Sequence, residues 1–378
     1  MHITLHLTNR CNMRCGYCYA PAAARNLDMT EEICERAVVL GSKSSGNTGI
    51  IFFGGEPLLM KDLIVHTVRF CREHERRVPA SFHFKATTNG LLLDAQFLSF
   101  AAREHVRIAL SFDGVQASHD LHRRSATAQG TFALVEPKIG PLLQAQPYAS
   151  VFMTVAPEAV DGYAESVSFL FDKGFRYIIA SLNYGGRWTD DHMKRLRTQY
   201  RRLSSWYERK TLAEEKFYFS PFEKKFATYI HGEKALCSQC HLGVRQISVG
   251  PDGAIYPCVQ FVQDGICNTA YAIGDVWSGI DSARQRELYE LSQAEDEQCS
   301  DCAIRSRCEH RCACLNWQAT GSIERVSPAL CESERVLTPI VDRLGERLFR
   351  KRSPMFMQKH YNSTYPLMSY LEDHLISV

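Results

Sequence analysis

The chain has 378 residues, of which 45% are hydrophobic and 23% charged, which is ordinary for a large globular domain with a smaller one. Its formal net charge is only +2, so nothing indicates a nucleic-acid or membrane-surface partner. The sequence has neither a membrane-spanning apolar run of ~18 residues nor an N-terminal signal peptide, which predicts a cytoplasmic protein. In a reducing compartment the 15 cysteines are expected to bind metal rather than form disulfides.

A cysteine loop follows the first predicted strand, residues 3–7. Cys11, Cys15 and Cys18 have the spacing C-x3-C-x2-C. Thiolates are soft ligands suited to iron–sulfur clusters, and three of them leave the fourth iron of a cube-shaped cluster open to a substrate or cofactor. A closed tetrahedral zinc site is the alternative, but it requires a fourth ligand nearby, and none follows. A loop after a strand of an α/β fold lies at the C-terminal mouth of the sheet, where active sites form.

Helix and strand patterns alternate after this loop. Residues 30–40 begin with the capping residue Thr30 and have helical apolar spacing, whereas residues 49–53 are predicted as a buried strand. Residues 61–75 are predicted as the next helix.

The sequence Gly54-Gly55-Glu56-Pro57 directly follows the second predicted strand. Two glycines let the backbone approach a ligand closely, and the carboxylate of Glu56 could accept a hydrogen bond from a ligand ammonium. Four residues alone are a weak motif. Their position after a strand, downstream of the cysteine loop, makes the motif strong.

Polar residues end two further predicted strands. Residues 81–90 run from a strand into a turn that contains Thr88 and Asn89, and the strand at 106–112 ends near Ser111 and Asp113. The hydroxyl of Ser111 and the carboxylate of Asp113 could bind ribose or carboxylate groups. A plain turn at Asp113-Gly114 is the alternative interpretation.

Strand–helix units at residues 150–173 and a strand at 176–183 complete six β/α repeats. They predict an α/β fold with a partial, laterally open (β/α)6 barrel, whose open side suits a large substrate such as a peptide. The helix at 190–210 is rich in Lys and Arg and could bind an acidic leader peptide or phosphate, although most such helices are merely solvated.

The C-terminal part contains most of the cysteines. Their spacing is C-x2-C-x17-C from Cys237 to Cys258, then C-x2-C-x5-C-x3-C from Cys299 to Cys312, then Cys331. Eight such cysteines could form two four-thiolate clusters, with two zinc sites as the alternative. A hairpin-like turn at 250–257 would present Cys258, and cluster binding would help this segment fold. We expect a barrel at 1–210, a linker at 211–235, a cysteine-rich domain at 236–335 and a helical tail at 336–378.

The N-terminal motifs resemble those of radical S-adenosylmethionine (SAM) enzymes. In that family the open iron binds SAM, and an electron from the cluster cleaves SAM to a 5′-deoxyadenosyl radical that abstracts hydrogen from the substrate. The resemblance implies a catalytic [4Fe-4S] cluster on Cys11, Cys15 and Cys18. It also implies SAM contacts at Tyr17, Gly54, Gly55, Glu56, Pro57, Thr88, Asn89, Ser111 and Asp113.

The C-terminal cysteines resemble the SPASM extension of that family, so that three [4Fe-4S] clusters are expected in all. The resemblance implies auxiliary cluster I on Cys237, Cys240, Cys258 and Cys312, and auxiliary cluster II on Cys299, Cys302, Cys308 and Cys331. Cys314 is the rival of Cys312 as a ligand. Cys267 and Cys314 are candidate hydrogen-atom donors, whereas Cys34 and Cys71 are expected in the core.

By this resemblance the chain is a peptide or ribosomal-peptide maturase, most similar in layout to anaerobic sulfatase-maturing enzymes, that crosslinks, oxidises or epimerises a residue. A flavodoxin- or ferredoxin-type electron donor is implied, and because only ten residues precede the first cysteine, any leader peptide would need the basic helix or a separate binding protein.

Two departures argue against sulfatase maturation: Val259 and Gln260 stand where those enzymes have an acidic residue, and Phe53 replaces a polar residue before Gly54. The alternatives are a radical SAM dehydrogenase acting on a small molecule and, in another class, an iron–sulfur electron-transfer or scaffold protein.

Overall fold

A nine-stranded sheet forms the centre of the protein, seen in a computed structural model that describes residues 1–20, 26–44, 46–232, 241–262, 270–294 and 296–371. Its strands are β1 (His2–His6), β2 (Asn47–Phe53), β3 (Ser81–Thr88), β4 (Val106–Ser111), β5 (Ser150–Val155), β6 (Tyr177–Leu182), β7 (Tyr218–Phe219), β8 (Gln246–Val249) and β9 (Ile255–Tyr256). They are ordered β7-β6-β5-β4-β3-β2-β1-β8-β9, and all neighbours are parallel except the antiparallel pair β8 and β9.

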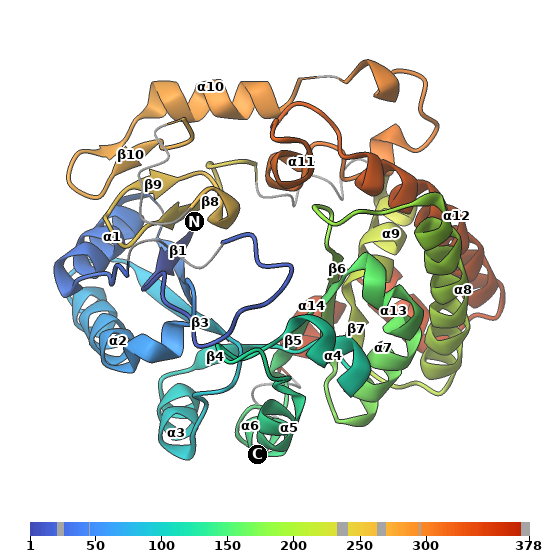
Figure 1. Ribbon diagram of the computed structural model, residues 1–378, viewed down its shortest axis with the longest axis horizontal. Helices are drawn as coiled ribbons and strands as arrows, with labels where there is room; N and C mark the ends of the chain where they lie inside the picture. Colours follow the sequence, from blue (N-terminus) through green and yellow to red (C-terminus); the bar gives the residue numbers. More distant parts are fainter. Residues whose placement is uncertain (21–25, 45, 233–240, 263–269, 295, 372–378) are drawn as a thin grey trace.

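Helices surround this sheet. Those of the first half are α1 (Glu31–Ser44), α2 (Lys61–Glu75), α3 (Ala95–Arg103), α4 (Gln116–His122), α5 (Phe132–Val135), α6 (Ile139–Ala145), α7 (Tyr163–Asp172), α8 (Asp190–Leu212) and α9 (Ser220–His231). The second half adds the small hairpin β10 (Gly274–Asp275) and β11 (Gly279–Ile280) and the helices α10 (Ser282–Ser292), α11 (Ala313–Thr320), α12 (Pro328–Arg350), α13 (Pro354–Tyr361) and α14 (Tyr365–Leu371). Figure 1 shows the strands in an inner arc, most helices outside it, and α10 and α11 across the opening of the arc.

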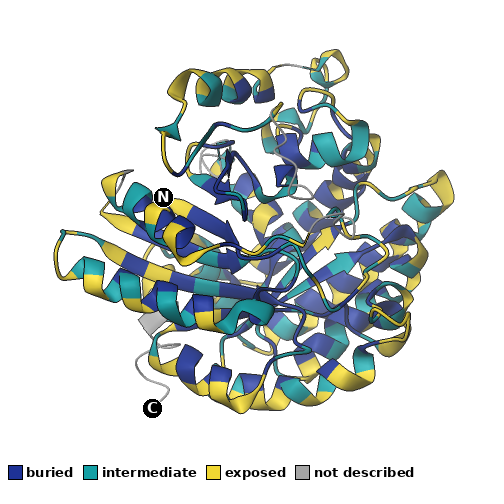
Figure 2. Ribbon diagram, turned by 60° about the vertical axis from the view of Figure 1, so that its left-hand side comes forward, coloured by how far each residue is buried: buried dark blue, intermediate teal, exposed yellow. Residues whose placement is uncertain are grey.

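Burial alternates along the strands, as expected for a sheet with helices on one face. In β3, Phe82, Phe84 and Ala86 are buried, whereas His83 and Lys85 are more exposed. Figure 2 shows buried residues gathered on the sheet and on the helix faces toward it, with exposed residues on the outer helix faces. None of the described helices is long and apolar enough to cross a membrane.

The predicted fold class, a partial barrel of six β/α repeats, is confirmed: β1 to β6 are parallel neighbours in chain order. The segment 211–235, for which we expected a linker, contains β7 and the whole of α9. Strand β7 extends the sheet beyond β6, and Phe222 and Phe226 of α9 are fully buried in the core. The remaining domain boundaries stay predictions.

The hairpin expected near Cys258 is formed by β8 and β9, and it has a partner that the sequence did not indicate. Strand β8 pairs in parallel with β1, so that His2 lies opposite Gln246 and Leu5 opposite Val249. The cysteine-rich half of the chain thereby continues the barrel sheet. Strand β9 runs back along β8, with Ile255 opposite Val249 and Tyr256 opposite Ser248, so that Cys258 lies toward the end of the sheet where β1 begins.

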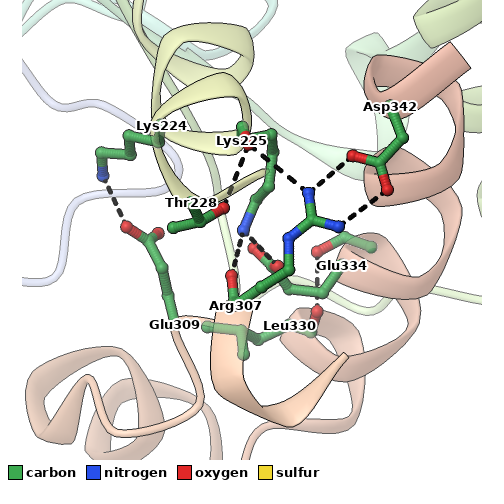
Figure 3. A network of polar contacts seen from close by, with 9 residues as sticks. Lys224, Lys225, Thr228, Arg307, Glu309, Leu330, Glu334 and Asp342 are labelled. Carbon is green, nitrogen blue, oxygen red and sulfur yellow. Dashed lines mark hydrogen bonds and ion pairs between the residues drawn. The ribbon is translucent and has the colours of Figure 1, made fainter. Parts of the chain in front are cut away.

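Three ion pairs lie between the cysteine-rich segment and the helices α9 and α12: two join the segment to a helix, and the third joins the two helices to each other (Figure 3). They are Lys224 with Glu309, Lys225 with Glu334, and Arg307 with Asp342. Arg307 and Glu309 flank Cys308 in sequence, and Lys225 also donates to the carbonyl oxygen of Arg307 at 3.1 Å. The network therefore fixes the chain on both sides of Cys308 against the barrel.

Candidate functional site

The cysteine loop leaves β1 and is held by its neighbours. The Thr8 hydroxyl donates to Asp28 at 2.6 Å, and the Arg10 guanidinium binds the same carboxylate at 2.6 and 2.9 Å. On the other side, the amide N–H groups of Gly55 and Glu56 donate to the carbonyl oxygens of Thr8 and Arg10 at 2.8 and 2.9 Å. The Gly-Gly-Glu-Pro segment and the cysteine loop thus form one backbone-paired unit.

The two glycines of this segment are required by that pairing. A Cβ at Gly54 would lie 2.3 Å from the carbonyl oxygen of Thr8, and a Cβ at Gly55 would lie 2.1 Å from that of Arg10. Gly54 also has φ +129°, a backbone conformation that favours glycine. The close approach that we predicted toward a ligand is therefore, at these two Cβ positions, an approach to the cysteine loop.

We expect Gly55→Ala to displace the loop and to lower its iron binding, because backbone atoms cannot rotate away as a side chain can. The packing cost should be about 1–3 kcal/mol. Iron bound per chain after anaerobic reconstitution measures the effect. Gly140→Ala in α6 is the matched control, since a Cβ there meets nothing within 4 Å; it should stabilise the helix by about 0.5–1 kcal/mol. Equal iron binding by both variants would contradict this role of Gly55.

The three thiols of the loop are accessible. Cys11 and Cys18 are exposed, Cys15 is half-buried, and none of them forms a disulfide among the described residues. The Cys11 sulfur accepts from the Met13 N–H at 3.4 Å and from the Asn89 side chain at 3.8 Å. Burial of its surroundings raises the pKa of the Cys11 thiol to about 12, so that metal binding would have to displace the proton.

This donor set fits an iron–sulfur cluster. Within the described part of the chain, no three Cys, His, Asp or Glu side chains are arranged around one metal ion. A cube-shaped cluster does not need that arrangement, because each thiolate binds a different iron. Three soft, accessible thiols on one anchored loop therefore suit such a cluster better than a single ion.

Glu56, Thr88 and Asn89 form a buried group behind the loop. One oxygen of Glu56 accepts from the Leu58 N–H at 3.0 Å and the Thr88 hydroxyl at 2.7 Å, and the other accepts from the Asn89 N–H at 2.8 Å. Burial raises the pKa of Glu56, and these donors oppose the shift. A carboxylate has about four acceptor sites, so one remains for the ligand ammonium that we predicted. Pro57 is also buried and starts a short 3₁₀ turn.

Asp113 connects the strand β4 to the cysteine loop. One carboxylate oxygen accepts from the Tyr17 hydroxyl at 2.5 Å and from Arg123 at 2.9 Å, and the other accepts from the Thr154 N–H at 2.9 Å. The guanidinium of Arg123 lies 5.5 Å from the centre of the Tyr17 ring. Asp113 thus fixes the position of the Tyr17 hydroxyl. Ser111, at the end of β4, is half-buried.

Arg123 is a further residue of the site, to which the sequence alone assigned no role. Burial alone would lower the pKa of its guanidinium, but Asp113, Tyr17 and Cys15 raise it overall. The buried pair of Arg123 and Asp113 needs both partners, because either charge alone would be strongly destabilised. The signal in the sequence is that Asp113, His119 and Arg123 lie close together in the chain. A carboxylate, a guanidinium and a histidine can therefore meet in the folded protein.

His119 is buried beside this pair and should make stability depend on pH. Its Nδ1 accepts from the Asp113 N–H at 3.3 Å, and its Nε2 is 3.1 Å from the Thr131 hydroxyl. Burial lowers the pKa of His119 to about 4. Between pH ~6.5 and ~4 the unfolded chain therefore binds a proton that the folded chain does not.

We expect the free energy of unfolding to fall as pH is lowered through this window, by up to about 3 kcal/mol for His119. Urea denaturation at several pH values measures the slope. The variant His119→Phe should show a shallower slope than the parent protein. An unchanged slope would mean that His119 is not neutral in the folded state.

Four of the C-terminal cysteines line one small cavity. They are Cys299, Cys302, Cys308 and Cys331, the set that we predicted for auxiliary cluster II. Arg305, His310, Val326 and Arg335 line the same cavity. The described structure thus brings these four thiols together from a loop and from the first turn of α12, although their role as ligands stays a prediction.

The predicted ligands of auxiliary cluster I are only partly within the described residues. Cys237, Cys240 and the candidate hydrogen donor Cys267 lie outside them. Cys258, Cys312 and Cys314 lie inside, and the sulfurs of Cys312 and Cys314 are 3.7 Å apart. Cys34 and Cys71 are fully buried in α1 and α2, in agreement with their predicted place in the core.

Tyr19 lies where the two cysteine groups meet. Burial raises the pKa of its hydroxyl, and Cys18, Cys258 and Cys314 add to the shift. Tyr19 is therefore close both to the third cysteine of the N-terminal loop and to the sulfurs of the C-terminal part. No sequence pattern indicated this, because the proximity depends on the pairing of β8 with β1.

The chain is similar to several known proteins. Residues 5–171 match the model of the radical SAM superfamily. A cysteine-type anaerobic sulfatase-maturating enzyme of Clostridium perfringens is 22% identical over 328 residues, covering 80% of this chain and 85% of the relative. A solved structure of native anSMEcpe with bound AdoMet matches with a TM-score of 0.77 at 19% identity, covering 92% of this chain and 99% of that one. The same protein with AdoMet and the Cp18Cys peptide matches with a TM-score of 0.75 at 20% identity, over 92% and 98% of the two chains. Residues 5–171 therefore form a radical SAM domain.

Proposed function

We propose that this radical SAM enzyme modifies a residue of a peptide or protein substrate, with two auxiliary iron–sulfur clusters in its C-terminal half. The observation that supports the proposal is the position of Tyr19, which lies close both to Cys18 of the N-terminal loop and to Cys258 and Cys314 of the cysteine-rich half. A substrate held beside Tyr19 would lie between the two groups of thiols. A solved structure with a similar fold contains both AdoMet and a peptide, which supports a substrate of this class.

The residues of the site have distinct parts in this proposal. Cys11, Cys15 and Cys18 would hold the catalytic cluster, and Glu56 would accept a hydrogen bond from the SAM ammonium. When bound there, the cluster and SAM would supply radical chemistry that removes a hydrogen atom from the substrate. Tyr17, fixed by Asp113, would cover the cluster on one side and exclude water.

The surroundings of Cys258 narrow the reaction. Val259 and Gln260 follow it in a short 3₁₀ turn, and neither side chain can accept a proton from a substrate heteroatom. This favours a crosslink or an epimerisation over the oxidation of Ser or Cys. The two would differ in the mass of the product, since a crosslink removes two hydrogens and an epimerisation leaves the mass unchanged.

The test is anaerobic reconstitution followed by iron and sulfide counting, with 5′-deoxyadenosine measured after reduction with dithionite. We expect about twelve irons per chain, four for each cluster, and release of 5′-deoxyadenosine. About eight irons without 5′-deoxyadenosine would instead support an electron-transfer protein. Incubation with short peptides encoded beside this gene, followed by mass spectrometry, tests the substrate class. Turnover of a small molecule with no peptide modified would support the dehydrogenase alternative.

A further inference from the structure

The central sheet contains no acidic residue. Neither Asp nor Glu occurs in any of the strands β1 to β9, whereas five basic side chains do, namely those of His2, His6, His83, Lys85 and Arg107. The formal net charge of the whole chain is only +2, so this bias is a property of the sheet. A surface that carries charges of one sign attracts ligands of the opposite sign.

Lys85 lies on the concave face of the sheet, inside the arc of strands in Figure 1. The preceding residue in β3, Phe84, points outward, because the guanidinium of Arg72 in α2 lies 4.8 Å from the centre of its ring. Successive residues of a strand point to opposite faces, so Lys85 points into the arc. Its Nζ is 4.2 Å from the centre of the Phe152 ring in β5, and β4 lies between the two strands. The side chain therefore crosses the concave face of β4.

The ammonium of Lys85 has no counter-charge. In the described part of the chain, no carboxylate forms an ion pair with it and no acceptor forms a hydrogen bond with it; the residue opposite it on β4 is another cation, Arg107. Burial lowers the pKa of Lys85 to about 8, and the charge of Arg107 adds to this shift. A half-buried ammonium with three donors free is costly unless an anion binds it. Lys85 is therefore suited to an anionic ligand.

The direction of the Lys85 side chain separates this ligand from SAM. Glu56, which would accept a hydrogen bond from the SAM ammonium, follows β2, on one side of β3, whereas Lys85 extends to β5 on the other side. The carboxylate of SAM is bonded to the same carbon as its ammonium and would stay near Glu56. Phe152 lies opposite Ser111 in register, so the ammonium of Lys85 is still close to the C-terminal end of β4, where a substrate would be held.

We infer that Lys85 binds a carboxylate of the peptide substrate, so that the enzyme selects a segment with an Asp or Glu close to the modified residue. The inference rests on the proposed function and adds to it the recognition of an acidic residue. The apolar stem of Lys85 remains packed along the sheet, while its ammonium donates a charge-assisted hydrogen bond to the carboxylate.

The test uses two capped tripeptides, acetyl-Gly-Asp-Gly-amide and acetyl-Gly-Asn-Gly-amide, with the reconstituted full-length protein in the presence of SAM. Ligand-observed NMR titration measures their dissociation constants. The parent protein should bind the Asp tripeptide about tenfold more tightly than the Asn tripeptide. Lys85→Met should lose this preference, because methionine keeps an apolar stem and removes the charge, and Lys85→Arg should retain it. Lys85→Gln is a second neutral variant that guards against a packing defect, and circular dichroism checks each fold. Lys43→Met, at an exposed lysine in the last turn of α1, is the matched control and should behave as the parent protein.

The opposite results would overturn the inference. Equal binding of the two tripeptides by the parent protein, binding of neither, or a preference that persists in both neutral variants would show that Lys85 selects no carboxylate. Displacement of the Asp tripeptide by a lower concentration of inorganic phosphate would assign the ammonium to a phosphate group, and weaker SAM binding by both neutral variants would assign it to the cofactor. A modified peptide without an acidic residue would refute this inference alone. A preference that depends on Lys85, in an enzyme that modifies no peptide, would support the carboxylate site and refute the proposed function.

Discussion

Replacing Cys15 by alanine is expected to remove the catalytic cluster and to abolish SAM cleavage. Cys15 is the middle thiol of the loop, and two remaining thiolates cannot hold three corners of the cluster. Loss of residues that merely orient a metal ligand typically costs 10- to 100-fold in affinity or activity, so the loss of a ligand itself should exceed roughly 100-fold. Iron content should fall from about twelve to about eight per chain, and 5′-deoxyadenosine should become undetectable.

The control for this variant is Cys34→Ala. Cys34 is fully buried in α1, away from the cysteine loop, and its sulfur contacts that of Met29 at 3.4 Å. Its replacement should lower stability by about 1 kcal/mol through lost packing and leave the iron content unchanged. Retained SAM cleavage in Cys15→Ala would show that the active cluster is not on the N-terminal loop.

Replacing Lys225 by methionine is expected to cause a large loss of stability, of about 3–5 kcal/mol. The side chains of Lys225 and Glu334 are only 3% and 5% exposed, and they form an ion pair at 2.5 Å (Figure 3). Burial raises the pKa of Glu334, and the charge of Lys225 opposes that shift. Without Lys225 a carboxylate would be left buried and uncompensated. Denaturation in urea measures the loss.

Two further variants separate this effect from a general sensitivity of α9. The neighbouring Lys224 is 53% exposed in its ion pair with Glu309, so Lys224→Met should cost no more than about 1 kcal/mol. Combining Lys225→Met with Glu334→Leu should restore most of the stability, because a buried ion pair can often be replaced by apolar side chains. Equal losses in the two single lysine variants would contradict the buried-charge argument.

The consequence for function lies in the position of this network. Arg307 and Glu309 flank Cys308 in sequence and are held by Asp342 of α12 and by Lys224 of α9. The cysteine-rich segment is thus attached to the barrel by charged side chains that do not depend on bound iron. Loss of Lys225 should therefore also make iron bound by Cys308 and its neighbours easier to remove.

The sequence by itself was sufficient for features encoded in short-range patterns. Helix α2 spans Lys61–Glu75 as predicted, and the Thr30 hydroxyl accepts from the Ile33 N–H at 3.3 Å, as expected of a capping residue. The six β/α repeats follow from apolar residues whose spacing alternates between that of a strand and that of a helix. The radical SAM domain follows from the cysteine spacing and from Gly-Gly-Glu-Pro. Each of these depends on residues that are close together in the chain.

A weaker local signal was missed in the segment expected as a linker. Strand β7 has only two residues, which is too short for an alternating pattern. It is recognised as a strand by its pairing with β6. The buried Phe222 and Phe226, four residues apart, are the helical pattern that could have revealed α9.

Other features were decided only by the tertiary structure. The pairing of β8 with β1 joins residues more than 240 positions apart, and Tyr19 lies close to Cys258 only in the folded chain. The hydrogen bonds to both carboxylate oxygens of Asp113 likewise depend on how separate segments pack, because their donors are Tyr17, Arg123 and Thr154. Spacing in the sequence identifies which residue types are available for chemistry. The distances between these residues, and the hydrogen-bonding capacity that each has left, are set by contacts between distant segments of the chain. No local sequence pattern records such contacts.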